Sequence, residues 1–383
     1  MAASNGPLSG ITIIEFAAIG PGPYGTMLLA DLGAEVIRLD RASDVHAPET
    51  ANRSSIGMGR NRRSIALDLK HPDAVATAKQ LIDAADVVVE GFRPGVMERL
   101  GLGPEVLCAT NPRLIYARIT GWGQDGPMNR AAGHDINYAS LAGALWPVGS
   151  KDRPPTPPLN LVADFGGGGT FLALGVLAAL FERERSGEGQ VVDAAMLDGA
   201  TSLLSFLYGW LATDMWRNER ESNLLDGAAP YYSAYACQDG EFLSVGALEP
   251  QFYAAFLTGL GLEHDAWPQM PESLWPEQKQ QIAALIASKP RDAWVEVFRD
   301  LDACVTPVLR PTEAHLYPHN QARELFVEVD GMTQPAPAPR FSRTPGTIRR
   351  GGATPGADTN EVLAAHGFDA DTIAHLRQAG AIA

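Results

Sequence analysis

Residues 11–41 have the sequence ITIIEFAAIGPGPYGTMLLADLGAEVIRLDR, in which two apolar runs flank a stretch of helical character. Ile11 to Phe16 and Glu35 to Leu39 are typical of short strands, and Tyr24 to Leu32 is typical of a helix. A strand, a helix and a second strand in this order form a βαβ unit, whose strands lie parallel. This stretch therefore predicts an α/β fold built on a mostly parallel sheet.

The same alternation continues downstream. Pro72 to Ala84 has apolar positions at helical spacing, and short apolar runs follow at Val87 to Val89 and Arg113 to Ile119. In a sheet of this kind, ligands bind beyond the carboxyl ends of the strands. The segments that directly follow the strands are therefore the first places to look for a functional site.

The pattern changes near Asp226, where short strands begin to alternate with helices in what we expect to be a second, smaller domain. We predict a large domain over residues 1–190 that is joined by the C-terminal segment 330–383, a helical linker over 191–225 and a small domain over 226–329. The remaining predicted elements are helices at Phe171–Arg185, Met196–Thr213, Gln251–Leu260 and Pro276–Ala287, strands at Tyr231–Cys237 and Phe242–Gly246, a linker at Thr333–Gly356 and a helical pair at Asn360–Gln378.

Charge and cysteine content narrow the class of protein. The 383 residues carry 45 acids against 30 bases, a net charge of −15, which disfavours nucleic acid and anionic membranes as partners. Three scattered cysteines are too few for a disulfide framework or a zinc site. Met1 to Gly10 lacks the basic and apolar regions of a signal peptide, and the uncharged run Phe165–Phe181 is short for a membrane span. We expect a cytoplasmic enzyme.

The turn after the first strand, Gly20-Pro-Gly-Pro-Tyr-Gly25, matches the dinucleotide-binding pattern G-x-G-x-x-G. Pro21 and Pro23 count against a dinucleotide, because proline has no N–H group to donate to a pyrophosphate. Arg38 and Arg41 also flank the strand end at which an NAD site has a lone acid. A tight strand-to-helix turn explains the pattern better, although the nearby cations indicate a phosphorylated ligand.

Two motifs follow later strands. Glu90-Gly-Phe-Arg-Pro-Gly95 places an arginine at the end of the third predicted strand, where its guanidinium suits a phosphate. Gly121-Trp-Gly-Gln-Asp-Gly-Pro127 is a glycine-dense loop of the kind that lets a ligand approach the backbone. Taken alone, the first is equally well explained as a surface arginine and the second as an ordinary turn.

Three further segments carry acid–base groups. His134 lies beside Asp135 in Gly133-His-Asp-Ile-Asn-Tyr138, and Asp164 precedes four glycines whose N–H groups could form an anion-binding nest. Glu249 stands between an apolar strand and a helix that begins at Pro250. Taken alone, a histidine is more often structural, and an acid at a helix start is more often a cap.

Together and in this order, the motifs resemble the family III CoA-transferase superfamily, from Leu8 to about Pro345. Within it, the chain is most similar to the branch that racemises 2-methylacyl-CoA thioesters in lipid metabolism. The resemblance implies a Rossmann-like large domain, a small α/β domain and an interlocked homodimer. The active site would then lie between the large domain of one subunit and the small domain of the other.

The resemblance also implies that CoA binds the large domain as part of the substrate, with no metal or redox cofactor. Four cations among the matching positions suit the phosphates of CoA. The positions that match the family's CoA contacts are Arg41, Leu67, Asp68, Leu69, Lys70, Gly91, Phe92, Arg93, Arg99, Gly133, Asp135, Ile136, Asn137 and Tyr138.

The family match assigns the chemistry to His134 and Asp164, with Glu249 paired to His134. Racemisation by 1,1-proton transfer removes a proton from one face of C2, forms an enolate and returns a proton to the other face. Backbone N–H groups near Asp135 would stabilise the enolate oxygen.

Other functions stay open. In a CoA-transferase, the aspartate matching Asp164 attacks the thioester and forms an acyl anhydride, so Asp164 alone does not separate the two chemistries. The presence of His134 and Glu249, and the lack of a glycine-rich lid near residues 246–251, favour a racemase. An NAD-dependent dehydrogenase is supported only by the turn at Gly20–Gly25, and a non-enzymatic acyl-CoA-binding protein is a fourth possibility.

Overall fold

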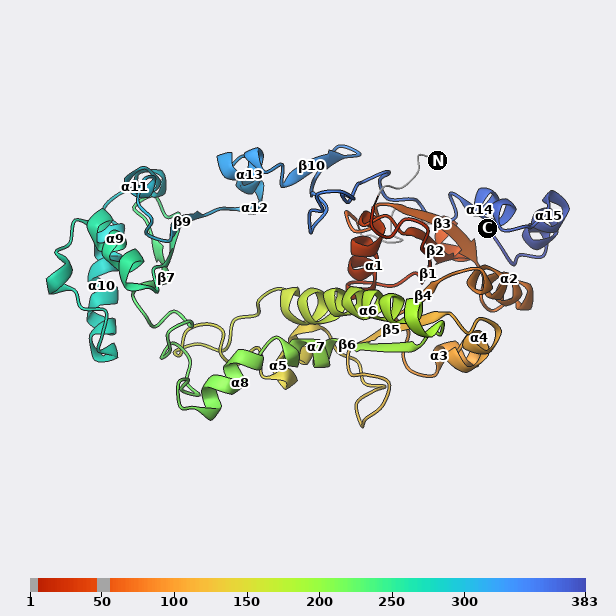
Figure 1. Cartoon of the computed structure of the whole chain (residues 1–383), viewed down its shortest axis with the longest axis horizontal. Coiled ribbons are helices and arrows are strands. Elements are labelled where there is room, and N and C mark those ends of the chain that lie inside the picture. Colours follow the sequence, from red (N-terminus) through yellow and green to blue (C-terminus); the bar gives the residue numbers. More distant parts are fainter. Residues whose placement is uncertain (1–5, 47–55) are drawn as a thin grey trace. The chain divides into compact units, whose positions relative to one another are not determined.

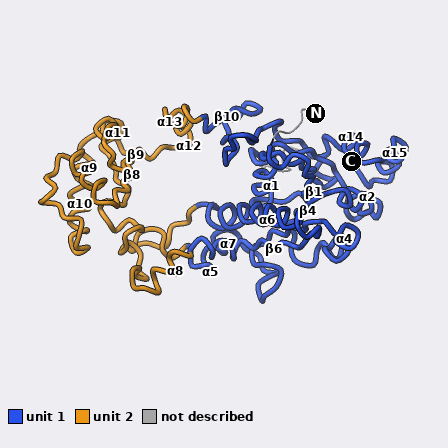
Figure 2. The backbone as a smooth tube through the Cα atoms, in the orientation of Figure 1, with its two compact units in different colours: residues 1–144, 159–204, 324–383 blue, residues 145–158, 205–323 orange. Residues whose placement is uncertain are grey.

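The computed structural model describes residues 6–46 and 56–383, so part of the predicted N-terminal segment Met1–Gly10 lies outside the described residues. The chain forms two compact units (Figure 2). Unit 1 comprises Met1–Ala144, Leu159–Leu204 and Glu324–Ala383, and unit 2 comprises Leu145–Pro158 and Ser205–Arg323.

Unit 1 is built on a parallel sheet of six strands (Figure 1), in the order β3-β2-β1-β4-β5-β6. This is the strand order of the Rossmann fold, and it confirms the predicted α/β class with a parallel sheet. The strands are β1 (Thr12–Phe16), β2 (Glu35–Arg41), β3 (Arg62–Leu67), β4 (Val87–Glu90), β5 (Ile115–Thr120) and β6 (Val191–Ala195).

Helices connect these strands and cover the sheet. The helices of unit 1 are α1 (Pro21–Asp31), α2 (Pro72–Asp83), α3 (Val96–Arg99), α4 (Pro104–Thr110), α5 (Asp135–Ala142), α6 (Thr170–Ser186), α7 (Met196–Ser202), α14 (Thr359–Ala365) and α15 (Ala370–Gln378). A short 3-10 helix η1 (Ala42–His46), a π-helix η3 (Leu161–Gly169) and a hairpin of β10 (Phe326–Val329) with β11 (Met332–Pro335) complete the unit.

Strand β3 was not predicted, because its sequence begins with two arginines and a serine. All three are buried, and each has a polar partner. Arg62 pairs with Glu15 of β1, and the Ser64 hydroxyl donates to Asp40 of β2 at 2.5 Å. Buried charges are stable only when they are paired, so the partners on neighbouring strands allow this polar segment to lie inside the sheet.

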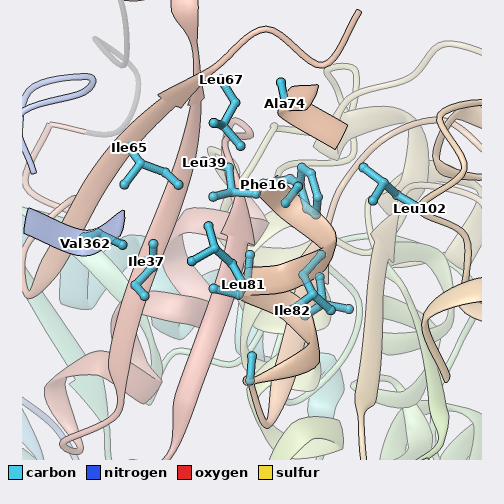
Figure 3. Packing of buried hydrophobic residues seen from close by; sticks show 14 of the residues in the cluster. Phe16, Ile37, Leu39, Ile65, Leu67, Ala74, Leu81, Ile82, Leu102 and Val362 are labelled. Atoms are coloured by element: carbon cyan, nitrogen blue, oxygen red, sulfur yellow. The ribbon is translucent and has the colours of Figure 1, made fainter. Parts of the chain in front are cut away.

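The main core of unit 1 lies on one face of the sheet, against α2 and the C-terminal helices. Figure 3 shows Phe16, Ile37 and Ile65 from three strands, Leu81 from α2 and Val362 from α14 within one apolar cluster. The C-terminal segment therefore contributes to the same core as the first ninety residues.

Unit 2 contains a three-stranded antiparallel sheet in the order β7-β8-β9, packed against helices. Its core combines aromatic side chains such as Tyr253, Phe256 and Trp294. The elements are α8 (Ser205–Ala212), β7 (Tyr232–Ala236), β8 (Phe242–Gly246), α9 (Pro250–Leu260), η4 (His264–Ala266), η5 (Glu272–Leu274), α10 (Trp275–Ile286), α11 (Arg291–Phe298), β9 (Val305–Val308), α12 (Pro311–Ala314) and α13 (Pro318–Ala322).

The predicted linker 191–225 contains structure that belongs to both units. Its first five residues form β6, which pairs with β5 at the edge of the unit 1 sheet. The single helix expected over Met196–Thr213 is instead two helices, α7 and α8, and the division between the units falls after Leu204.

The helical stretch Leu161–Ser186 is long and apolar enough to cross a membrane by length and composition, with a mean hydropathy of 1.6. Core helices of water-soluble proteins can have the same composition. In α6, Leu172, Val176 and Leu180 are buried, whereas Leu174 and Phe181 are exposed. The helix thus buries one face in unit 1 and leaves the other uncovered.

Candidate active site

His134 stands at the N-terminus of α5, which begins with Asp135. Its backbone is extended, and its N–H donates to Oδ1 of Asn137 at 3.0 Å, which caps the helix. The first N–H groups of a helix, here those of Asp135 and Ile136, have no acceptor inside the helix. The exposed imidazole of His134 therefore lies next to N–H groups that can bind a developing negative charge.

Tyr138 joins this helix to the motif Gly121–Pro127. Its hydroxyl donates to the carbonyl oxygen of Gly133 at 2.6 Å, and its ring meets Trp122 edge to face. A Cβ on Gly121 would lie 2.2 Å from the tyrosine ring. Gly121 is thus required for close packing against Tyr138, whereas the sequence suggested that this loop admits a ligand.

Asp135 connects the two proton-transfer candidates. Its side chain is buried, and its Oδ2 accepts hydrogen bonds from the backbone N–H groups of Ala163 at 2.7 Å and Asp164 at 2.8 Å. His134 precedes Asp135 in the chain, so one carboxylate holds the start of α5 against the η3 turn that carries Asp164. The family resemblance implied that Asp135 contacts CoA, and nothing in the sequence indicated this connecting role.

Asp164 is half-buried in η3 and beside the turn at Gly20, where a Cβ would lie 3.4 Å from Oδ2. Burial raises the pKa of the Asp164 carboxyl, and the charge of Asp135 raises that pKa further. The Asn160 amide, which donates at 3.4 Å, and the charge of His134 both lower it. His134 and Asp164 are therefore within electrostatic reach of each other in the same unit.

The glycines after Asp164 have a different role from the predicted anion-binding nest. A Cβ on Gly167 would lie 2.4 Å from the backbone nitrogen of Ala200, and the next two glycines would meet α7 and α1 at similarly short distances. These glycines let η3 approach both helices at backbone distance. Close packing, which fixes the position of Asp164, explains the run.

The turn at Gly20–Gly25 has the geometry expected of a strand-to-helix connection. Gly20 has φ of 73° and precedes α1, and Pro21 and Pro23 lie in its first turn. The structure thus supports the tight-turn explanation of this motif, whose first glycine leaves room for the Asp164 carboxylate.

The four predicted phosphate-binding cations differ in exposure and pairing from the arginines that are buried in the sheet. Arg41, Lys70, Arg93 and Arg99 are exposed, and none of them makes an ion pair with a described residue. Arg38, in contrast, is buried and pairs with Asp40 at 2.8 Å. Arg41, Lys70 and Arg93 lie at or within three residues of the carboxyl ends of β2, β3 and β4, where an open parallel sheet binds its ligand, and Arg99 ends the short helix α3 that follows β4.

Charged residues of two other motifs act on the hydroxyl of Tyr138. Burial raises the pKa of the Tyr138 hydroxyl, the charge of Asp164 raises it further, and the charge of Arg93 lowers it. Arg93, Tyr138 and Asp164 come from separate motifs, and the charges of Arg93 and Asp164 both reach the Tyr138 hydroxyl. The loop that carries Arg93 therefore lies near Tyr138 and the proton-transfer candidate Asp164.

The buried Glu90, the first residue of the motif that contains Arg93, supports the loop that follows it. Glu90 accepts from the N–H of Phe92 at 2.7 Å and from Nε of Arg118 at 2.7 Å, and Arg118 also pairs with Glu98 at 2.8 Å. Burial raises the pKa of the Glu90 carboxyl, and the charge of Arg118 lowers that pKa in part. Glu90 thus holds the backbone of Phe92 and thereby positions the loop that carries Arg93.

Glu249 belongs to unit 2, where it precedes α9 as the helix-capping residue. Its side chain is exposed and has no hydrogen bond to any described residue. The pairing of Glu249 with His134 stays a prediction. Within residues 6–46 and 56–383, no group of three or more His, Cys, Asp or Glu side chains is arranged to hold a metal ion.

Fold and site together define an α/β protein with a Rossmann-type sheet, which presents a candidate acid–base pair and cations that have no ion-pair partner among the described residues. The family model described as CoA-transferase family III matches residues 8–359, and the chain belongs to this family.

Curated relatives include racemases. The chain is 46% identical to alpha-methylacyl-CoA racemase of Mus musculus and 44% identical to alpha-methylacyl-CoA racemase of Homo sapiens, over 96% of this chain and 96% of each relative. A crystal structure of a CAIB/BAIF family protein from Brucella suis has the same fold, with a TM-score of 0.82 and 24% identity over 95% of this chain and all of that chain.

Proposed function

We propose that the protein is an isomerase that interconverts the R and S configurations at C2 of 2-methylacyl-CoA thioesters. The observation that carries this proposal is the arrangement of His134 and Asp164, which the Asp135 carboxylate holds in one unit within electrostatic reach of each other. The similarity to alpha-methylacyl-CoA racemases over 96% of the chain supports the same activity.

The chemistry needs two groups in opposite protonation states. The thioester carbonyl acidifies the C2 proton, one group removes that proton, and the electron pair moves onto the carbonyl oxygen to give an enolate. The second group then protonates C2 from the other face, and the enolate oxygen returns to a carbonyl. In one direction the imidazole of His134 accepts the proton and the carboxylic acid of Asp164 donates one, and in the other direction the roles are reversed.

The raised pKa of Asp164 suits this exchange of roles. Burial and the neighbouring Asp135 charge make the protonated form of Asp164 more accessible than that of an exposed aspartate. A donor and an acceptor work best when their pKa values approach the operating pH.

The N-terminus of α5 is the candidate oxyanion site. The N–H groups of Asp135 and Ile136 have no intrahelical acceptors, and the helix dipole favours a negative charge there. Removing a single donor of this kind from an enzyme typically costs about 10²–10³ in kcat.

CoA would bind along the strand ends through Arg41, Lys70, Arg93 and Arg99, with Leu67–Leu69, Gly91, Phe92 and the segment 133–138 as further contacts. The four cations are exposed and lack ion-pair partners among the described residues, so they are available for phosphates. CoA is part of the substrate, and we propose no metal or redox cofactor.

We further propose that the enzyme acts as an interlocked homodimer in the cytoplasm, in lipid metabolism. In such a dimer, Glu249 of the partner subunit would orient the imidazole of His134 and balance its charge, as a carboxylate does for other catalytic histidines.

A family III CoA-transferase is the second candidate, because the family includes such enzymes and Asp164 is accessible. In that reaction, a carboxylate oxygen of Asp164 attacks the thioester carbonyl, an acyl anhydride forms, and the CoA thiolate leaves. His134 has no necessary part in this chemistry, so its position close to Asp164 favours the racemase.

Incubation of the enzyme in D₂O with separate R and S 2-methylacyl-CoA thioesters tests the proposal. A racemase incorporates deuterium at C2 with no second substrate and yields both configurations. Exchange that requires an acceptor acid, or an anhydride at Asp164 that hydroxylamine traps, would instead support the transferase. Acyl-CoA binding without any exchange would identify a non-enzymatic binding protein.

A further inference from the structure

The last three residues of the chain lie on the outer edge of β3, which is an edge strand of the sheet (Figure 1). Ile382 forms an antiparallel bridge with Leu67. The N–H of Asp68 donates to the carbonyl oxygen of Ala381 at 3.0 Å, and the N–H of Ala383 donates to that of Ala66 at 3.1 Å. Residues 381–383 therefore continue the sheet beyond β3.

Side chains at the start of α14 fix the same edge. The hydroxyl of Thr359 lies within donating distance of the backbone oxygens of Gly356, at 2.8 Å, and Ala383, at 3.0 Å, and it accepts from the N–H of Ala66 at 3.3 Å. Asp358 accepts from the N–H of Ser64 at 2.8 Å and donates its own N–H to the Ser64 carbonyl at 2.9 Å. The edge of β3 is thus bonded along its length by residues almost 300 positions away in the sequence.

This attachment is buried. Ala381 and Ile382 are 0% and 3% exposed, and Leu67 is 2% exposed within the same apolar cluster. Buried backbone groups that lose their partners cost free energy, so residues 381–383 and the end of β3 hold each other in place.

The register places the candidate CoA contacts next to this attachment. Arg41 of β2 is opposite Leu67 of β3, which in turn bridges Ile382. The exposed Lys70 follows three residues after Leu67, in a turn where its N–H donates to Asp68 Oδ1 at 3.1 Å. One row across the sheet therefore links Arg41, the Leu67–Lys70 stretch and the C-terminal residues.

We propose that residues 381–383 are a positioning element for CoA. They hold the end of β3, and with it Arg41 and the Leu67–Lys70 turn, in the geometry that receives the phosphate-bearing nucleotide half of CoA. This inference rests on the proposed function, because it takes Leu67–Lys70 as a CoA contact. The contacts of residues 381–383 are with β3, the residue after it, α14 and α15, so we expect them to act on CoA binding and not on proton transfer.

Two variants and two substrates test the proposal. Deletion of residues 381–383 removes the bridge, whereas Ala383→Pro keeps these residues but removes the N–H group that donates to Ala66 and restricts the backbone there. Each is assayed with a 2-methylacyl-CoA thioester and with the matching pantetheine thioester, which lacks the nucleotide. Ile373→Ala is the control, because Ile373 is buried in the same cluster but belongs to α15 and makes no backbone hydrogen bond to β3.

We expect the KM for the CoA thioester to rise at least about fivefold in the deletion variant, which corresponds to about 1 kcal/mol at 1.4 kcal/mol per tenfold. The rise should be smaller in Ala383→Pro. The kcat values and the kinetics of the pantetheine thioester should stay unchanged, because the proton-transfer groups are intact. Ile373→Ala should keep the wild-type KM for both substrates.

The outcomes separate this proposal from the function on which it rests. If the wild-type enzyme uses both thioesters with equal KM, the assignment of CoA to the strand ends fails. If the wild-type enzyme prefers the CoA thioester and both variants keep that preference, the positioning role is overturned. The positioning role is also overturned if the variants lose activity equally toward both thioesters.

If the deletion variant does not fold, the proposal is tested by Ala383→Pro and by one measurement on the wild-type enzyme. Hydrogen exchange at the amides of Asp68 and Ala383 should slow together when CoA binds, because both amides bond across the same edge. Slowing at neither amide in saturating CoA would overturn the proposal.

Discussion

Replacing Asp135 tests how the protein holds its two proton-transfer groups. Asp135→Ala removes a buried carboxylate oxygen that accepts two backbone hydrogen bonds, at 2.7 and 2.8 Å, from the turn carrying Asp164. Hydrogen bonds to charged groups contribute about 1.5–3 kcal/mol each, so about 3–6 kcal/mol that restrains η3 is lost. If only about 3 kcal/mol of this appears in the barrier, kcat falls by more than about 100-fold.

Asp135→Asn separates geometry from charge. The amide oxygen still accepts both N–H groups, but neutral hydrogen bonds are about half as strong, so kcat should fall less than in Asp135→Ala. Loss of the negative charge also lowers the pKa of Asp164, which the Asp135 charge raises. Asp164 donates a proton only below its pKa, so the rate in the direction that uses Asp164 as the donor should decline from a lower pH than in the wild type.

The assay is C2 deuterium incorporation from D₂O, followed by NMR for each enantiomer across a pH series. Asp73→Ala is the matched control, since Asp73 is also an acid in the first turn of a helix, but its side chain is 48% exposed and faces His71 at 3.8 Å, and it accepts no hydrogen bond from the turn that carries Asp164. It should change kcat by less than about twofold. If Asp135→Ala keeps kcat within about threefold of the wild type and Asp135→Asn leaves the pH profile unchanged, Asp135 does not position Asp164.

Three further variants probe the supporting structure. Gly167→Ala should lower kcat and destabilise the protein by about 1–3 kcal/mol in urea unfolding, because the added Cβ meets the backbone of α7. Gly209→Ala, the control, has open space around its Cβ and should change neither quantity. Equal stabilities of the two variants would show that η3 is not tightly packed. Glu15→Gln should destabilise by about 3–5 kcal/mol in the same assay, because it leaves the buried Arg62 charge unpaired, and a loss below about 1 kcal/mol would contradict this. Arg93→Ala should raise the KM of a CoA thioester about tenfold, with that of the pantetheine thioester unchanged, and equal KM changes for both would remove Arg93 from phosphate recognition.

Much of unit 1 could be predicted from the sequence because its strands and helices have clear apolar periodicity. The run Ile11–Phe16 and the helix after it correspond closely to β1 and α1. Strand β3 could not be found in this way, since the charges of Arg62 and Arg63 are neutralised by residues on other strands. Long-range ion pairs of this kind are invisible to local pattern analysis.

The site shows a similar division. His134 and Asp164 could be identified as chemical groups, but the tie between them through Asp135 depends on a hydrogen bond across 29 positions. The glycines after Asp164 suggested an anion nest, and only the short distances to α1 and α7 reveal that they serve packing. Glu249 belongs to a separate compact unit, so neither periodicity nor spacing relates it to the histidine.

The measurement that tests the central claim most directly follows deuterium incorporation in His134→Ala and Asp164→Ala, with pure R and pure S substrate in separate reactions. Two opposed proton-transfer groups predict that neither variant racemises, that each exchanges at most one enantiomer, and that the two variants differ in which one, while CoA affinity stays close to that of the wild type. Near-wild-type racemisation by either variant, or exchange of both enantiomers by both, would contradict the account.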